Sequence, residues 1–234
     1  MKLSLVIPCY NEMENIPLLL ERCKEVSNRA GCEVILVDNG STDDSPKVLR
    51  ELLPKYPGCR SVRVERNQGY GFGILAGLES AKGEIIGWTH ADMQTDPQDA
   101  LRGMEFFESV GSNIFVKGQR YGRPLGDIIF TLGMSIFETI LLRKPMRDIN
   151  AQPTLFHRDF YSDWASPPHD FSLDLYAYFM ARKGRLRVLR FPVLFAERVH
   201  GESHWNIDFS SKVKFIKRTL TYSFELFKKM KRDE

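Results

Sequence analysis

The feature that most constrains the fold is a regular alternation in the first half of the chain. Short runs rich in β-branched residues alternate with segments of helical apolar spacing. This alternation predicts an α/β fold, with a mainly parallel central sheet and helices on both faces. The expected strands are 3–7, 33–37, 61–65, 84–88 and 114–118, and the expected helices are 16–26, 46–53, 73–81 and 100–110.

The second half of the chain is less regular. It predicts a long apolar helix near 127–142, a strand at 152–156, a helix at 173–182 and a strand at 186–195. The chain has 234 residues, of which 43% are hydrophobic, enough for one sizeable core, and it shows no internal repeat or low-complexity linker. We therefore expect one domain over 1–208, followed by a basic amphipathic helix over 209–234.

Apolar runs and cysteines bear on the compartment. No uninterrupted apolar run approaches the roughly 20 residues of a membrane-spanning helix, and the start of the chain does not resemble a signal peptide. The four cysteines show no CxxC pair and no zinc-like spacing with histidine. We expect a cytoplasmic protein with reduced thiols and without structural zinc.

The net charge of +3 is unevenly distributed, because residues 209–234 carry +5 and residues 1–208 carry −2. A body without a basic excess argues against nucleic acid as a partner. Apolar residues in the tail recur at helical spacing between lysines, a pattern typical of an interfacial helix on an anionic membrane. Packing on its own domain or in a homo-oligomer is the alternative. The stripe consists of Phe209, Val213, Ile216, Leu220, Phe224 and Phe227.

Polar residues follow the predicted strands, where ligands bind in open parallel sheets. Asp38 ends the second strand and can accept a hydrogen bond from a ribose or base, or serve in a helix-capping loop. His90, Asp92 and Gln94 follow the fourth strand at alternate positions, so an extended backbone puts them on one side. Such donors suit Mg²⁺ or Mn²⁺ bound to a diphosphate, although a solvated surface loop is the ordinary alternative.

Two further patterns are weaker. Residues 71–76 match G-x-G-x-x-A but follow the third strand, so we interpret them as a helix-opening loop near a phosphate and not as a dinucleotide site. His200 and His204 have the spacing of a zinc pair on a helix, but Gly201 indicates a loop. We expect these histidines to donate to a phosphate-bearing ligand.

Five motifs occur in a fixed order: VIPCYNE, VDNGSTD, NQGYGFGILAGLESAKGEIIGWTHADMQTDP, KGQR and RVHGESHW. Over residues 1 to about 205 this ordered set resembles the inverting glycosyltransferases of family 2, with the GT-A fold. It is most similar to the polyprenyl-phosphate sugar transferases related to dolichyl-phosphate mannose synthase. The resemblance implies an enzyme on the cytoplasmic face of a membrane that uses Mn²⁺ or Mg²⁺ and a GDP- or UDP-sugar donor. The implied acceptor is a polyprenyl phosphate, with a soluble or saccharide acceptor in surface-polysaccharide synthesis as the alternative.

The resemblance also implies residue roles. The base and ribose would be held by Pro8, Tyr10, Glu12, Asp38 and Asn67. The metal and diphosphate would be held by His90, Asp92 and Gln94. The donor or acceptor phosphates would be bound by Arg120, Arg198 and Ser203.

The chain departs from the family pattern at two positions. His90 stands where the family usually has a carboxylate, and His204 stands where it often has lysine. Loss of one negative charge at the metal site should weaken Mg²⁺ binding and relatively favour Mn²⁺. A catalytically silent nucleotide-sugar binding module is therefore the alternative from another functional class.

The acceptor determines whether a general base is required. A hydroxyl acceptor needs one, and Asp174 is the first candidate, with Asp170 second. A phosphate acceptor needs none, because its second pKa is about 6. We expect Asp174 at the mouth of the pocket, with a solvated helix-face carboxylate as the alternative.

Overall fold

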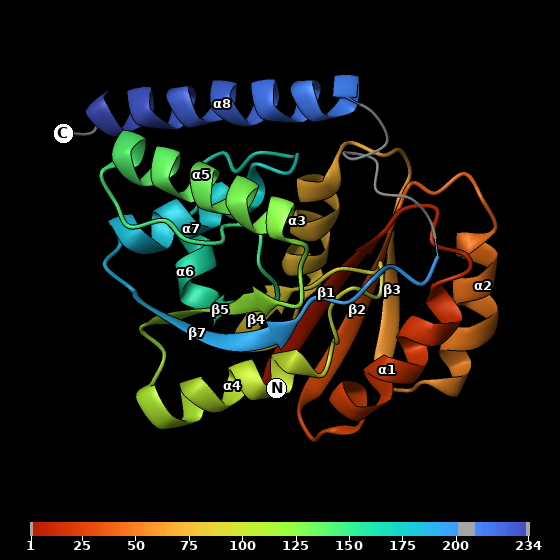
Figure 1. Cartoon of the computed structure of the whole chain (residues 1–234). Helices are drawn as coiled ribbons and strands as arrows, with labels where there is room; N and C mark the ends of the chain where they lie inside the picture. The colour runs from red at the N-terminus through yellow and green to blue at the C-terminus, as the bar shows by residue number, and fades with distance from the viewer. Residues whose placement is uncertain (1, 201–208, 233–234) are drawn as a thin grey trace.

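The computed structural model describes residues 2–200 and 209–232, with side chains of 216–231 in the second range. Seven strands form one sheet in the order β3-β2-β1-β4-β6-β5-β7 (Figure 1). β6 is antiparallel to β4 and β5, and the other pairs are parallel, so the predicted mainly parallel α/β sheet is confirmed. The strands are β1 (Leu3–Cys9), β2 (Cys32–Asn39), β3 (Cys59–Val64), β4 (Ile85–Trp88), β5 (Ile114–Tyr121), β6 (Thr154–His157) and β7 (Arg187–Leu194).

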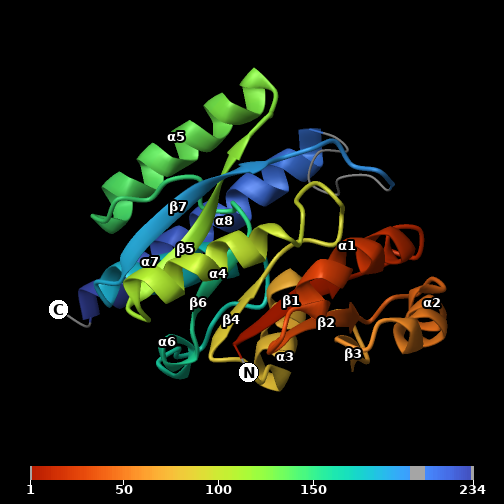
Figure 2. The same cartoon turned by 90° about the horizontal axis from the view of Figure 1, so that it is seen from below.

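Helices cover both faces of the sheet (Figures 1 and 2). One core cluster joins the sheet to α1, α2 and α4, and the other joins it to α3, α7 and the ends of α5 and α8. Strands covered on both faces are apolar on both sides, which explains the near-continuous apolar runs of β1 and β2. The helices are α1 (Ile16–Asn28), α2 (Ser45–Leu52), α3 (Tyr70–Ser80), α4 (Asp99–Val110), α5 (Leu125–Leu142), α6 (Arg158–Ser162), α7 (Leu173–Lys183) and α8 (Phe209–Arg232), with a 3-10 turn at Leu53–Lys55.

The parallel strands bring their carboxyl ends to one edge of the sheet. Cys9 at the end of β1 is in register with Asp38 near the end of β2, and Val6 of β1 is in register with Trp88 at the end of β4. The loops that follow these three strands are therefore neighbours. All four cysteines are buried and unpaired.

The two longest helices, α5 and α8, lie side by side (Figure 1). α8 coincides with the helix predicted in the tail, and its Leu226 and Met230 belong to the core. Among the described residues, α5 is the one helix long and apolar enough, by length and a mean hydropathy of 1.7, to cross a membrane. Polar residues interrupt the sequence of α5, so it contains no long uninterrupted apolar run.

Candidate active site

The loop after β1 is fixed to the loop after β2. The backbone N–H of Asn11 donates to Ser41 Oγ at 3.0 Å, and that of Glu12 donates to Ser45 Oγ at 3.0 Å. Asn11 adopts a φ of 55° and accepts the Thr42 N–H with its side chain at 2.8 Å. Serine and asparagine side chains thus satisfy the turn and hold the Glu12 backbone in place.

The residues expected to hold the nucleoside are distributed along this edge. Asp38 is buried, and its carboxylate accepts the Ser41 N–H at 3.0 Å and Arg63 Nη1 at 2.7 Å. Asn67 Oδ1 accepts the Gly69 N–H at 2.8 Å in the turn before α3. Pro8 is half-buried in β1, whereas Tyr10 is 37% exposed. Asp38 and Asn67 therefore already have structural partners, and Tyr10 has an accessible ring.

Asp92 connects the loop after β4 to the chain that follows β7. Its carboxylate pairs with Arg198 Nη2 at 2.8 Å and accepts the Gln94 N–H at 3.2 Å. Gln94 Nε2 donates to the carbonyl of Ala196 at 3.1 Å, and the Ala196 N–H returns a bond to the Gln94 carbonyl at 2.8 Å. The structure thus brings together Asp92, Gln94 and Arg198, three of the residues that the sequence analysis expected in the site.

Glu12 faces the same charges. Burial raises the pKa of its carboxyl and the negative charge of Asp92 adds to this rise, while a hydrogen bond from Asn15 at 2.6 Å and the Arg198 charge oppose it. Arg198 pairs directly with Asp92 alone, and its charge acts on Glu12 from a greater distance.

His90 lies beneath a stack of rings. Its imidazole stacks on Tyr70 with centroids 5.7 Å apart, and Tyr70 stacks on Phe171 at 4.6 Å. Burial lowers the pKa of His90, against the opposing effect of Asp92 and Asp174, so we expect a neutral imidazole. Arg218 of α8 lies 5.5 Å from the Phe171 ring centroid, which links α8 to the site.

The glycines of the G-x-G pattern allow close packing within the protein. A Cβ atom at Gly71 would lie 2.7 Å from the carbonyl oxygens of Pro168 and Asp170. Gly69 has a φ of 113°, and a Cβ there would lie 2.4 Å from the His169 carbonyl oxygen. The glycine requirement thus comes from segment 168–170, which the beginning of α3 touches.

The position of Asp174 differs from both sequence interpretations. It is 1% exposed in the first turn of α7, neither at an open pocket mouth nor in solvent. Gln152 Nε2 donates to its carboxylate at 2.7 Å, and Lys117 Nζ lies 3.9 Å away. Burial raises the pKa of Asp174, opposed by the Lys117 and His90 charges. The apolar face of α7 packs on the sheet and carries this carboxylate inward with it.

The second candidate base also has partners. Asp170 accepts the Ser172 N–H at 2.9 Å and pairs with Arg218 Nε at 3.2 Å. Beneath Asp174, the Lys117 ammonium is buried and donates to Thr154 Oγ1 at 2.7 Å. Burial lowers the pKa of Lys117 to about 7.

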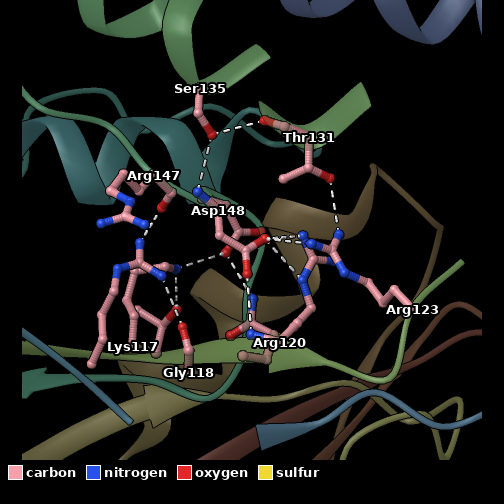
Figure 3. A network of polar contacts seen from close by, with 12 residues as sticks. Lys117, Gly118, Arg120, Arg123, Thr131, Ser135, Arg147 and Asp148 are labelled. Atoms are coloured by element: carbon pink, nitrogen blue, oxygen red, sulfur yellow. Dashed lines mark hydrogen bonds and ion pairs between the residues drawn. The ribbon is translucent and has the colours of Figure 1, made fainter. Parts of the chain in front are cut away.

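Two arginines, one at the end of β5 and one just after it, share one carboxylate (Figure 3). Arg120 pairs with Asp148 through its side chain, with Nε 3.0 Å from Oδ1, and donates its backbone N–H to Oδ2 at 3.2 Å. Arg123 Nη2 lies 3.8 Å from the same carboxylate and donates through Nη1 to Thr131 Oγ1 at 2.9 Å. Burial of Arg123 and the Arg120 charge lower the Arg123 pKa. The charges of Asp148 and Asp127 oppose this lowering, and the two guanidinium groups provide the hydrogen-bond donors that an anion site requires.

Several of these residues escaped the sequence analysis. The sequence could have identified Lys117, because it places a charged residue within the apolar strand IFVKG. It could not have identified Arg123, Asp148 and Gln152, because their partners are distant in sequence. Ser203 and His204 lie outside the described residues. Within 2–200 and the described part of α8, no group of three or more His, Cys, Asp or Glu residues is placed to hold a metal ion.

Several curated proteins that are similar in sequence to this chain have the same name. The undecaprenyl-phosphate 4-deoxy-4-formamido-L-arabinose transferase of Edwardsiella ictaluri (strain 93-146) is 29% identical over 220 residues, which cover 87% of this chain and 63% of that protein. The protein of that name from Sodalis glossinidius (strain morsitans) is 33% identical over 156 residues, 64% of this chain and 42% of the relative. The chain thus spans less than two thirds of their length.

Solved structures share the fold. Glucosyl-3-phosphoglycerate synthase from Mycobacterium tuberculosis, in complex with Mn²⁺, UDP and glucosyl-3-phosphoglycerate, superposes with a TM-score of 0.69 at 16% identity, covering 97% of this chain and 79% of that one. A mannosyltransferase from Pyrobaculum calidifontis with GDP-Man and Mn²⁺ gives 0.66 at 20% identity, covering 86% and 58%. These likenesses confirm the predicted GT-A fold. The family model for glycosyl transferase family 2 matches residues 4–162, and the chain belongs to that family.

Proposed function

We propose that this protein is an inverting glycosyltransferase that moves a sugar from a nucleotide-diphosphate sugar to a polyprenyl phosphate. The observation that carries the proposal is the Arg120–Arg123 pair, which shares the carboxylate of Asp148 beneath the apolar helix α5. Two guanidinium groups beside an apolar helix suit a phosphate on a lipid chain. The names of the curated relatives support the same acceptor.

The donor half of the proposal rests on the loops after β1, β2 and β4. We propose that Tyr10, with its exposed ring, and Asp38 bind the base and ribose, and that Arg198, paired with Asp92, binds the diphosphate. Arg198 is well suited to stabilise the charge that develops on the leaving diphosphate.

A divalent ion would need ligands from the donor as well as from the protein. Asp92 already pairs with a cation and its neighbour His90 is expected to be neutral, but among the described residues no three His, Cys, Asp or Glu side chains are grouped to hold an ion by themselves. We propose that Asp92 and His90 hold the ion together with the donor diphosphate. Gln94 is the weaker candidate, because its amide nitrogen bonds to Ala196. When bound, Mn²⁺ or Mg²⁺ supplies neutralisation of the diphosphate charge.

The burial of Asp174 favours a phosphate acceptor over a hydroxyl acceptor. A base must reach the proton that it removes, whereas this carboxylate lies beneath the surface, bonded to Gln152 and close to Lys117. A lipid phosphate is already ionised near neutral pH and needs no base. We therefore assign Asp174 a supporting role beneath His90.

We also propose that the protein works at the cytoplasmic face of a membrane. The predicted stripe on α8 supports this only in part. Phe224 is 49% exposed and meets Phe137 edge-on, and Phe227 packs against the core. Two lysines of α8, Lys228 and Lys229, are exposed and available for an anionic surface.

The test is transfer from a panel of GDP- and UDP-sugars, with Mn²⁺, Mg²⁺ or a chelator, to undecaprenyl phosphate and to the matched alcohol undecaprenol. We expect product from the phosphate alone, and a loss of at least about tenfold in Arg120→Gln, because a charged hydrogen bond to the acceptor is removed. Asp92→Asn should abolish metal-dependent donor binding. Transfer to the alcohol or to a saccharide would overturn the lipid-phosphate acceptor, and tight nucleotide binding without turnover would support the silent module.

A further inference from the structure

Helix α5 is amphipathic, but its apolar face points outward and polar side chains lie on its inner face, the opposite of a surface helix on a protein in water. Leu125 and Ile140 are 71% and 74% exposed, and Ile129, Leu132 and Ile136 are each more than half exposed. Steps of four, three, four and four residues align these side chains on one stripe along the helix. An aqueous medium would select charged residues at these positions.

The opposite face of α5 is polar and buried. Ser135 Oγ accepts the Asp148 N–H at 3.1 Å, and Thr139 Oγ1 accepts the Met146 N–H at 2.9 Å. Glu138 is fully buried and accepts the Ser223 hydroxyl of α8 at 2.5 Å. These bonds hold α5 on the protein by its polar side and leave the apolar stripe facing outward.

Beneath α5 lies a cavity of about 60 Å³. It is lined by Arg120 and Glu138 and by the apolar side chains of Phe130, Met134 and Leu175. α5 therefore separates an apolar exterior from a polar interior that contains the Arg120–Arg123 pair. This order, from apolar to cationic, matches the order of groups met from a bilayer's acyl region to its phosphates.

We propose that the stripe Leu125, Ile129, Leu132, Ile136 and Ile140 is the surface by which the protein docks on a lipid bilayer, with α5 lying in the plane of the headgroups. The proposal rests on the proposed function only in its choice of lipid as the occupant. It places Arg123, two residues before α5, at the level of lipid phosphates. It replaces the α8 stripe as the principal apolar contact.

Charge supports a membrane over a second copy of the chain. Arg143 and Arg147 are exposed just beyond the C-terminal end of α5. On α8, beside α5 in Figure 1, Lys228, Lys229 and Lys231 are exposed. An anionic leaflet attracts such residues, whereas pairing two copies through α5 would bring basic residues of both together.

The contacts on the inner face of α5 also indicate whether this helix lies on the membrane or crosses it. Eighteen residues span about 27 Å, close to the thickness of the hydrocarbon core. Crossing would break the bonds of Ser135 and Glu138 to Asp148 and Ser223 and carry a carboxyl into hydrocarbon. In the plane of the interface, all of these bonds persist.

The experiment is flotation of the purified chain with phosphatidylcholine vesicles, with and without phosphatidylglycerol, at low and high salt. The vesicles contain no polyprenyl phosphate and no donor is added, so failure of the proposed function does not affect the readout. We expect binding to anionic vesicles that weakens with salt, and a drop of about tenfold in partitioning for Leu132→Glu, because one apolar anchor becomes an anion.

Leu18→Glu is the matched control, because Leu18 is an exposed leucine on α1, on the other side of the sheet. Thermal unfolding in solution checks that both variants fold. Equal vesicle binding by wild type and Leu132→Glu would overturn the proposal, as would a dimer in light scattering that Leu132→Glu dissociates. Loss of binding in a Phe224→Glu variant alone would return the docking role to α8.

Discussion

Helices α5 and α8 lie side by side but meet different surroundings. From sequence, α8 has the pattern of a membrane-surface helix, and α5 is only a long apolar helix. In the structure, α8 buries Ser223, Leu226 and Met230 against the protein, whereas α5 buries Ser135, Glu138 and Leu142 and exposes the stripe that begins at Leu125 and ends at Ile140. Periodicity identifies the two faces of a helix, but it does not identify the medium that each face meets.

The largest expected effect tests whether α8 is part of the folded body. Leu226→Ala removes a side chain that is 4% exposed within the core. We expect a loss of about 2–4 kcal/mol in the free energy of unfolding, measured by urea denaturation, because a cavity is left. Ile140→Ala, the exposed counterpart on α5, should change it by less than about 0.5 kcal/mol in solution. Equal small effects would mean that α8 is not docked as described.

Glu138 gives the contact between the helices a pH dependence. Burial raises the pKa of Glu138 from 4.5 to about 7, against a partial lowering by the Ser223 hydrogen bond. The folded state therefore binds the proton more tightly than the unfolded state. The stabilisation is complete below about pH 4.5 and is lost as pH rises through about 7.

The measurement is the stability of wild type and of Glu138→Gln across this range. The wild type should lose roughly 2–3 kcal/mol more than the variant between pH 4.5 and 8, since each pKa unit corresponds to about 1.4 kcal/mol. Parallel pH profiles of the two proteins would contradict the assignment. Glutamine keeps the side-chain volume and an acceptor for the Ser223 hydroxyl. The difference between the two pH profiles therefore reports the protonation of Glu138.

A smaller effect concerns the inner face of α5 and the arginine pair. Ser135→Ala leaves the Asp148 N–H without its acceptor. We expect a cost of about 1–2 kcal/mol in stability, because a buried donor loses its partner. If Asp148 orients Arg120, the KM for the lipid phosphate should rise while donor affinity stays unchanged. A rise in the donor KM alone would place the arginine pair on the donor side.

The smallest effect concerns the link from α8 to the donor site. Arg218 is partly exposed, pairs with Asp170 and lies over the Phe171 ring. Arg218→Gln should cost no more than about 1 kcal/mol in stability, because solvent screens the ion pair. Calorimetric unfolding measures this loss, and a cost several times larger would show that Arg218 is part of the core.

Local pattern determined the edge of the sheet that we propose as the donor site. Alternating strands and helices imply a parallel sheet, and a parallel sheet brings the residues after each strand to one edge. The sequence therefore predicted that Glu12, Asp38 and Asp92 lie along one edge, and the structure places Asp92 with Arg198, over 100 residues away. The ordered motifs predicted the family, which the family model confirms.

Only the tertiary structure decided the contacts of the region that we propose as the acceptor site. Asp148 meets Arg120 and Arg123, Asp174 turns inward to Gln152, and α5 presents its apolar face outward. Each outcome depends on contacts between segments that no local spacing connects. An unpaired buried donor or acceptor costs more than an exposed apolar side chain. On α5 the bonds to Asp148, Met146 and Ser223, together with the burial of Leu142, therefore favour the face that turns inward.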